Sequence, residues 1–373
     1  MKTHPRTIDL DAVVNSITEG LYIVDTDRRI LYWNRGAEQI TGWKAEEVVG
    51  SFCRDGILEH VDSADHKLCH SDFCPLYRSI HSGKSLRVSS LVHALTRKGK
   101  RVPVEVTTSA YRDGGGRIIG GIEVFRDMSA AMAEMQAARL IQRDAITLSA
   151  PTGGRASFEV AYHPRDLVGG DFVRIEKLDN SRFSFLLADV TSHGVSAALF
   201  TLLLRSLWEE QTGLWGEPLE AASHLNSRLG AYGSENGYFA SALFGLLDAE
   251  AHSLAFCSAG SPPFLRREAG GRVTVHEATG HLLGAEEDPG YEKRSLALAR
   301  GDRLLFCTDG AFEAENAAGE PAGIERLTER FARMGENESL EEFCARVEED
   351  LLAYSGLLQL PDDFTAVLVR LPE

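Results

Sequence analysis

The chain has 373 residues, a formal net charge of −16, and 43% hydrophobic and 25% charged residues, which supports two or three folded domains rather than a disordered chain. No apolar run approaches the ~18 residues that a membrane helix needs, and the N-terminus lacks the apolar core of a signal peptide, so we expect a cytoplasmic protein with no membrane partner. Residues 1–130 hold 18 Lys+Arg and 17 Asp+Glu, so the negative charge lies in the remainder and argues against nucleic acid as a partner.

Residues 9–127 have the pattern of a small α+β domain. The stretch "GLYIVDTDRRILYWN" predicts two strands around a turn, and "NRGAEQITGWKAEEVVG" predicts short helices broken at Gly42 and Gly50. Three strand-like runs follow a long loop: "SLRVSSLVHALT", "RVPVEVTTSAYR" and "IIGGIEVFRDM". This order, together with "WNRGAEQITGW" and "GIEVFRDMSA", resembles a PAS sensor domain. The resemblance implies one antiparallel sheet with short helices.

The long loop of this segment, "SFCRDGILEHVDSADHKLCHSDFCPLYRSIHSG", is rich in soft metal ligands. Cys53, Cys69 and Cys74, together with His70, could supply a Zn²⁺ or iron site. Two of the thiols could instead form a redox pair. The simplest alternative is three buried thiols beside solvated histidines. A haem or a flavin is compatible with a sensor of this kind, although no residue of the sequence demands either one.

Residues 128–150 form a predicted helical linker. The run from 128 to 148 contains no Gly or Pro, and small or apolar residues recur in it at spacings of four and three. They are Ala131, Met135, Ala138, Ile141, Ala145 and Leu148. The pattern suits a signalling helix between two domains and equally a helix packed on its own domain.

Residues 151–373 alternate apolar strands with amphipathic helices. Aspartates stand at four places where predicted strands begin or end, held by a rigid element yet directed out of the core. Asp171 follows a Gly-Gly turn, Asp189 ends "FSFLLADV", Asp309 follows "DRLLFCT", and Asp362 and Asp363 open "DDFTAVLVRL". Converging carboxylates repel unless cations lie between them, and oxygen ligands favour Mg²⁺ or Mn²⁺. Two such ions about 3.5–4 Å apart can activate a water for attack on phosphorus.

The ordered motifs of residues 166–371 resemble the SpoIIE-type branch of the metal-dependent PPM serine/threonine phosphatases. The matching pieces are "VGGDF", "LLADVTSHGVSAAL", "LNSRL", "FASALFGLLD", "SAGSPP", "GDRLLFCTDGAFEAEN" and "DDFTAVLVRL". The resemblance implies a β-sandwich flanked by helices, with two Mn²⁺ or Mg²⁺ ions at one end. We therefore expect an α+β chain with a PAS domain, a helical linker and a PPM-type sandwich.

The resemblance also carries ligand roles to particular positions. Asp189 is expected to bridge both ions, and Asp171 to ligate directly or through water. Asp362 is preferred to Asp363 because the matching family position precedes an Asn or Asp that is not a ligand. Catalysis is assigned to Asp171, Asp189 and Asp309. The full expected ligand set is Asp171, Asp189, the carbonyl of Val190, Asp309 and Asp362.

The sequence departs from the family pattern at a few positions near these ligands. Ser192 replaces the usual Gly, Val173-Arg174 replaces an aromatic followed by Asp, and Ser258 and Ser261 replace the Asn and His of a common Asn-Ala-Gly-His. None of these changes removes an expected metal-binding carboxylate. They bear on substrate contacts, loop geometry and turnover.

The functional hypothesis is a signal-regulated, metal-dependent protein phosphatase. The PAS domain would sense a signal, the helix would relay it, and the sandwich would hydrolyse phosphoserine or phosphothreonine on a partner protein. The resemblance implies a phosphorylated anti-sigma-factor antagonist as the substrate, and we expect a homodimer. The rival hypothesis is a non-catalytic PAS-regulated module that binds partners through a degenerate phosphatase fold. The altered loops favour it, and the full set of carboxylates speaks against it.

Overall fold

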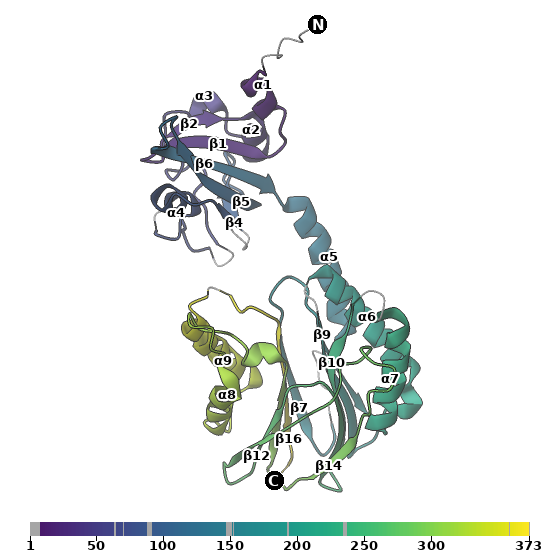
Figure 1. The fold of residues 1–373 in the computed structure, drawn as a ribbon. Helices are drawn as coiled ribbons and strands as arrows, with labels where there is room; N and C mark the ends of the chain where they lie inside the picture. Colours follow the sequence, from purple (N-terminus) through teal and green to yellow (C-terminus); the bar gives the residue numbers. More distant parts are fainter. Residues whose placement is uncertain are drawn as a thin grey trace. The chain divides into compact units, whose positions relative to one another are not determined.

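Figure 1 shows the computed structural model of the chain, which divides into two units, residues 1–134 and 135–373. The two units are described separately. The boundaries at residues 127 and 150, drawn from the sequence, remain predictions. The described residues are 8–62, 65–69, 71–87, 92–146, 151, 153–191, 194–233, 237–357 and 359–372.

The first unit is built on an antiparallel sheet, with strand order β2-β1-β6-β5-β3 and β4 paired to β5. Its core holds Tyr22, Trp33 and Phe125, whose rings contact one another. The predicted hairpin is confirmed, because the first two strands pair antiparallel. The strands are β1 (Gly20–Asp25), β2 (Ile30–Trp33), β3 (Leu86–Arg87), β4 (Val92–Leu95), β5 (Arg101–Arg112) and β6 (Ile118–Asp127).

Short helices join these strands, and local side chains fix where they begin and end. Asn34 caps α2, because its Oδ1 accepts a hydrogen bond from Ala37 N at 2.8 Å, and Gly42 ends the helix at a φ of 78°. The helices of the unit are α1 (Leu10–Asn15), α2 (Arg35–Thr41), α3 (Ala45–Val48) and α4 (Pro75–Ser82).

Helix α5 (Ser129–Ala145) follows β6 directly, and the division between the two units falls within it. Ser129 N donates to Asp127 Oδ1 at 2.7 Å at its start. The side chains of Gln142 and Ala145 are buried near its end, whereas Ile141 is 60% exposed. The predicted helix is therefore present, but only its last turn is buried.

The second unit contains two antiparallel sheets of five strands each. The strand orders are β14-β11-β10-β9-β8 and β13-β12-β15-β16-β7. Their bounds are β7 (Ser157–His163), β8 (Asp171–Lys177), β9 (Arg182–Val190), β10 (Ala240–Asp248), β11 (Ser253–Ala259), β12 (Phe264–Arg267), β13 (Val273–His276), β14 (Lys293–Ala297), β15 (Arg303–Cys307) and β16 (Phe364–Arg370).

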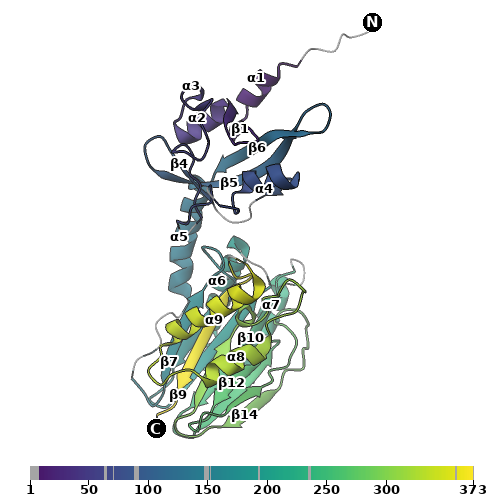
Figure 2. The ribbon, with the colours of Figure 1, turned by 90° about the vertical axis from the view of Figure 1, so that its left-hand side faces the viewer.

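The two sheets pack face to face between two pairs of helices (Figures 1 and 2). Phe306 of one sheet contacts Phe185 of the other, with ring centroids 4.9 Å apart. Helices α6 (Val195–Glu210) and α7 (Pro218–Gly233) cover the first sheet, and α8 (Gly323–Ala332) and α9 (Leu340–Ser355) cover the second. This four-layer arrangement confirms the predicted α+β class with a helix-flanked sandwich.

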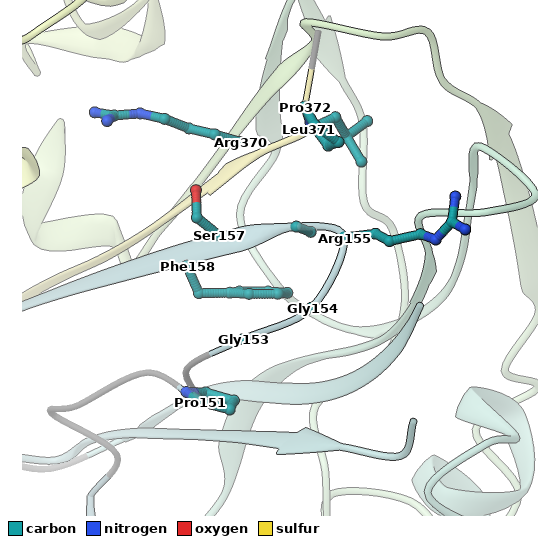
Figure 3. Close-up of a pocket in the computed structure, with 10 residues that line it drawn as sticks. Pro151, Gly153, Gly154, Arg155, Ser157, Phe158, Arg370, Leu371 and Pro372 are labelled. Atoms are coloured by element: carbon teal, nitrogen blue, oxygen red, sulfur yellow. The ribbon is translucent and has the colours of Figure 1, made fainter. Parts of the chain in front are cut away.

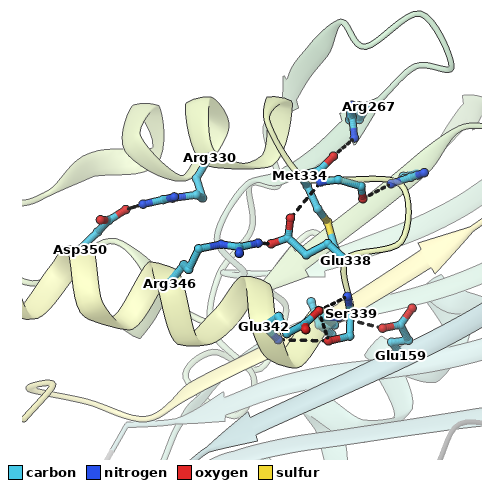
Figure 4. Close-up of polar contacts among 12 residues, drawn as sticks. Glu159, Arg267, Arg330, Met334, Glu338, Ser339, Glu342, Arg346 and Asp350 are labelled. Atoms are coloured by element: carbon cyan, nitrogen blue, oxygen red, sulfur yellow. Dashed lines mark hydrogen bonds and ion pairs between the residues drawn. The ribbon is translucent and has the colours of Figure 1, made fainter.

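Helix α9 is fixed at its start by a capping box (Figure 4). Ser339 Oγ accepts from Glu342 N, and Glu342 Oε2 accepts from Ser339 N at 3.0 Å. Leu340 N donates to Glu159 Oε2 of β7 at 2.8 Å, which ties the helix to the sheet. In the described part of the chain, no helix has the length and apolar character needed to cross a membrane.

Candidate metal centre at one edge of the sandwich

The predicted site aspartates lie at one edge of the second unit. Strand β8 begins at Asp171 and β9 ends one residue after Asp189, and the antiparallel register places these two residues directly opposite each other. Side chains in this relation lie about 5 Å apart at their Cβ atoms. In the other sheet, Asp309 follows the end of β15, and Asp362 and Asp363 precede the start of β16, its antiparallel neighbour. The topology thus brings distant parts of the sequence to the same edge.

A hydrogen bond joins the two sheets at this edge. Thr308 Oγ1 donates to Asp171 Oδ2 at 2.8 Å and accepts from Thr365 N at 2.9 Å. The Asp171 side chain is fully buried, and its second oxygen, Oδ1, has no hydrogen-bond partner among the described residues. A buried carboxylate oxygen without a partner is unfavourable, and a bound cation would supply one.

The carboxyl groups disfavour each other's charge. Burial, followed by the charges of Asp309 and Asp362, raises the pKa of Asp189 to about 8. Burial and then Glu313 raise the pKa of Asp309 to about 6. Burial and then Asp189 raise the pKa of Asp171 well above its usual range. A cation among these groups would reverse the effect by favouring the ionised carboxylates.

The neighbouring aspartates at the start of β16 are engaged differently. Asp363 is buried, and its two carboxylate oxygens accept hydrogen bonds from Arg165 N at 2.7 Å and Gly170 N at 2.6 Å. Asp362 is exposed, and within the described part of the chain only its Oδ1 accepts a hydrogen bond, from Asp363 N at 2.8 Å. Asp363 therefore holds the turn before Asp171, while Asp362 keeps an oxygen for a ligand. The choice of Asp362 as the ligand agrees with this geometry and stays a prediction.

Two glycines allow the backbone to approach this turn closely. A Cβ on Gly310 would lie 2.0 Å from the carbonyl oxygen of Asp363, and one on Gly169 would lie 2.4 Å from its Oδ2. Neither distance is possible for a real side chain. The segments that carry Asp171 and Asp309 therefore need glycine beside them.

Gln142 of α5 was not identified from the sequence, although it contacts the same turn. Its Nε2 donates to Gly169 O at 2.6 Å and to Thr201 Oγ1 of α6 at 3.0 Å, and its Oε1 accepts from Gly169 N at 3.2 Å. A buried glutamine in an otherwise exposed helix gives no signal in a single sequence. Through it, the predicted linker reaches the backbone two residues before Asp171.

The proposed ligands do not form a closed metal site among the described residues. Across the described residues, no three or more His, Cys, Asp or Glu side chains are arranged so that they could hold a metal ion as they stand. The aspartates therefore lie near one another without closed coordination. The unpartnered Asp171 oxygen and the mutually raised pKa values favour a hard cation, and ligation by these residues and by the Val190 carbonyl stays a prediction.

The sensor cysteines gain no support as a metal site from the described residues. Cys53, Cys69 and Cys74 are buried free thiols. Burial raises the pKa of Cys53 to about 12, so its thiol is protonated at neutral pH. His70 lies outside the described residues, as does Ser192. Zinc, iron, haem and flavin are likewise unsupported, and the redox alternative stays untested.

A cavity of about 510 Å³ lies at the other end of the sandwich (Figure 3). It is lined by the start of β7, the glycines at 153 and 154, and the residues from Arg370 to Pro372 at the end of β16. None of the aspartates of the candidate centre lines it. The cavity is therefore separate from the end of the sandwich that carries the aspartates. We take this end, the carboxylate edge, as the functional site.

The four-layer sandwich with an edge of aspartates belongs to the class of PP2C-type folds. Residues 179–372 match the family Stage II sporulation protein E (SpoIIE), and residues 8–128 match the PAS fold. Because the first match spans more than half of the chain, this protein belongs to the SpoIIE family, with a PAS domain before the family domain. This outcome confirms the recognition made from the sequence motifs.

Several known proteins are similar to this chain. Phosphoserine phosphatase RsbP of Bacillus subtilis is 26% identical over 183 residues, which cover 48% of this chain and 45% of RsbP. Phosphoserine phosphatase RsbU of the same organism is 24% identical over 243 residues, covering 64% and 70%. The SiaA-PP2C domain of Pseudomonas aeruginosa has a TM-score of 0.57 at 23% identity, covering 65% of this chain and 99% of that domain. The chain thus spans less than half of the length of RsbP.

Proposed function

We propose that this protein is a signal-regulated, metal-dependent phosphatase that hydrolyses phosphoserine or phosphothreonine on a partner protein. One observation carries the proposal: aspartates from distant strands lie at one edge of the sandwich, where burial and then neighbouring carboxylates raise the pKa of Asp189 and Asp171, and Asp171 Oδ1 is buried with no hydrogen-bond partner among the described residues. The names of RsbP and RsbU, both phosphoserine phosphatases, support the same activity.

The residues that would hold two Mn²⁺ or Mg²⁺ ions are hard oxygen donors, as these ions prefer. When bound, such ions supply an activated water and positive charge for the reacting phosphoryl group. Thr308 orients the Asp171 carboxylate through its hydrogen bond, and Asp363 holds the backbone at Gly170. The proposed ligands are Asp171, Asp189, the Val190 carbonyl, Asp309 and Asp362.

The division of labour along the chain is also part of the proposal. Residues 9–127 act as the PAS sensor, 128–150 as the signalling linker and 151–373 as the phosphatase domain. The proposed substrate is a phosphorylated anti-sigma-factor antagonist, and the proposed assembly is a homodimer. The contact of Gln142 with Gly169 supports a role for the linker, because it reaches the turn that carries Asp171.

The test is hydrolysis of p-nitrophenyl phosphate and of a phosphoserine peptide by the purified full chain, with Mn²⁺ or with a chelator. Asp189→Asn and Asp309→Asn should each lower the Mn²⁺-dependent kcat by roughly a hundredfold or more, because each removes a ligand charge. Glu250→Gln, an exposed change in the turn after β10, is the matched control and should leave the rate unchanged.

Two results would contradict the proposal in different ways. Unchanged hydrolysis in both aspartate variants would remove the assigned metal site. If the wild-type chain hydrolyses neither substrate with either metal, the interaction module without catalysis becomes the better interpretation.

A further inference from the structure

A hollow of about 400 Å³ lies in the first unit, between the β1–β2 turn and α4. Its lining brings two guanidinium groups and an imidazole together with the Asp27 carboxylate, and Asp55 Oδ1 lies 3.8 Å from Arg54 Nε beside it. This balance differs from that of the whole chain, whose formal charge is −16. The lining includes Asp27, Arg28, Phe52, Arg54, Tyr77 and His81.

Both guanidinium groups lie over aromatic rings that line the same hollow. The Cζ atom of Arg28 is 5.2 Å from the centroid of the Tyr77 ring, and that of Arg54 is 4.8 Å from the centroid of the Phe52 ring. A guanidinium that covers a ring still presents N–H donors at its edge, in the fork that matches a carboxylate. Arg29 also lies over the Phe52 ring, and the His81 ring lies 3.9 Å from the Tyr77 ring, centroid to centroid. The hollow therefore combines anion donors with the edges of two aromatic rings.

The backbone at Arg28 adopts a conformation that a bulky residue rarely takes. Its φ is 70°, in the left-handed region that glycine and asparagine enter more easily. The turn is held by Asp25 Oδ1, which accepts from Asp27 N at 2.9 Å and from Arg29 N at 2.8 Å. A turn that needed only this conformation would be served better by Gly or Asn. An arginine kept in it points to a task for the side chain.

The Arg28 side chain is also fixed from its other end. Its Nη1 donates to the carbonyl of Cys69 at 2.9 Å, so the turn is tied to the cysteine loop. This bond places the guanidinium in advance of any ligand. A donor that is already positioned loses less conformational entropy when an anion binds.

We propose that this hollow binds a small organic carboxylate, whose carboxylate group accepts N–H donors from Arg28 and Arg54 and whose carbon skeleton lies against the rings of Phe52 and Tyr77. The planar guanidinium fork suits a carboxylate. The Asp27 carboxylate in the lining opposes a dianion such as phosphate, and the two rings favour an organic body. The site lies outside the carboxylate edge of the second unit, so the proposal does not depend on the phosphatase activity.

The test is calorimetric titration of the full chain with benzoate, phenylacetate and inorganic phosphate at constant ionic strength. We expect at least one of the two carboxylates to bind with a dissociation constant below about 1 mM, and phosphate to bind more weakly. Arg28→Asn, which keeps a residue suited to the left-handed backbone, and Arg54→Gln should each weaken carboxylate binding roughly tenfold or more.

Arg29→Gln is the matched control, because Arg29 also lies over the Phe52 ring, at 4.5 Å, but does not line the hollow. The Arg29→Gln variant should bind the carboxylates with the same affinity as the wild type. The proposal is overturned if neither carboxylate binds the wild-type chain, if both bind Arg54→Gln as tightly as the wild type, or if phosphate binds and the carboxylates do not. Should Arg28→Asn fail to fold, Arg54→Gln alone still decides.

Discussion

At the scale of single residues, a buried acid and a buried base face each other in the first unit. His60 Nε2 and Glu123 Oε1 are 3.6 Å apart, and neither atom has a hydrogen-bond partner among the described residues. Glu123 stands on β6, opposite Tyr22 of β1 and Thr108 of β5. Burial raises the pKa of Glu123 to about 8, and burial followed by the charge of Arg101 lowers that of His60 to about 4. Both groups are therefore neutral near pH 7.

This pair predicts a loss of stability at alkaline pH that Glu123→Gln should remove. The Glu123 carboxyl keeps its proton up to about pH 8 in the folded protein but releases it near pH 4.5 in the unfolded chain. The contribution of Glu123 to the free energy of unfolding therefore falls as pH rises. His60 acts in the opposite direction below 6.5, because only the unfolded imidazole takes up a proton there. The two effects offset each other up to about pH 6.5. A net fall of about 2 kcal/mol remains between pH 6.5 and 8.

The measurement is the melting temperature of wild type and Glu123→Gln at pH 6 and at pH 8. The glutamine has the shape of the protonated carboxyl but cannot ionise, so the variant should gain on the wild type at the higher pH. Glu46→Gln, at an exposed position, is the control. An equal difference between wild type and Glu123→Gln at the two pH values would contradict the assignment.

The sequence predicted the candidate carboxylates but not the residues that position them. An aspartate beside Gly where an apolar strand begins or ends is a local pattern, and Asp171 and Asp309 both show it. Gly170 N donates to Asp363 across 193 positions of the sequence, and Thr308 donates to Asp171 across 137 positions. Such contacts depend on how the two sheets pack, and no local pattern contains them.

At the scale of elements, the last turn of α5 connects the linker to the candidate centre. Gln142→Ala should remove four hydrogen bonds, one of them from Tyr162, and leave the amide and carbonyl of Gly169 without their partner. A buried polar group left unpaired costs about 1–3 kcal/mol. Asp171 lies two residues after Gly169. We therefore expect the Mn²⁺ concentration that gives half-maximal activity to rise.

Gln136→Ala is the matched control, since Gln136 is exposed on the same helix. The two variants have the same chemical change and a similar effect on helix propensity. Metal titrations of the hydrolysis rate, with circular dichroism to verify folding, separate a local effect on the turn from a loss of the helix. Identical metal dependence in Gln142→Ala and Gln136→Ala would exclude the role of this contact.

The long elements were predictable, and the short edge strands were not. The buried strand β9 and the helix α9 have strong apolar patterns over 9 and 16 residues. The edge strand β14 alternates exposed and half-buried positions over "KRSLA", so only two of its residues are apolar. It exists because it pairs with β11, a partner that lies almost forty positions earlier in the chain. The run predicted as one strand over 85–96 contains β3 and β4, which both pair with β5.

At the scale of the whole molecule, the carboxylate edge is a cost to folding that metal binding would offset. Within the second unit, burial and then the charges of neighbouring carboxylates raise the pKa of Asp171 and Asp189, so ionising these groups together disfavours the folded state. The acidic balance of the chain, at −16, adds to this repulsion. A ligand that binds only the folded state stabilises it according to its concentration and affinity.

Mn²⁺ should therefore raise the melting temperature of the second unit even where no substrate is present. At a hundred times the dissociation constant, binding contributes about 2.7 kcal/mol, which corresponds to a rise of roughly 5–10 °C for a unit of this size. The fluorescence of Trp208 and Trp215, which pack together in the second unit, reports its unfolding. Asp309→Asn should abolish most of the rise, and Glu250→Gln should keep it. Because turnover is not involved, a rise that persists in Asp309→Asn would place the bound ion elsewhere, whatever the hydrolysis assays give.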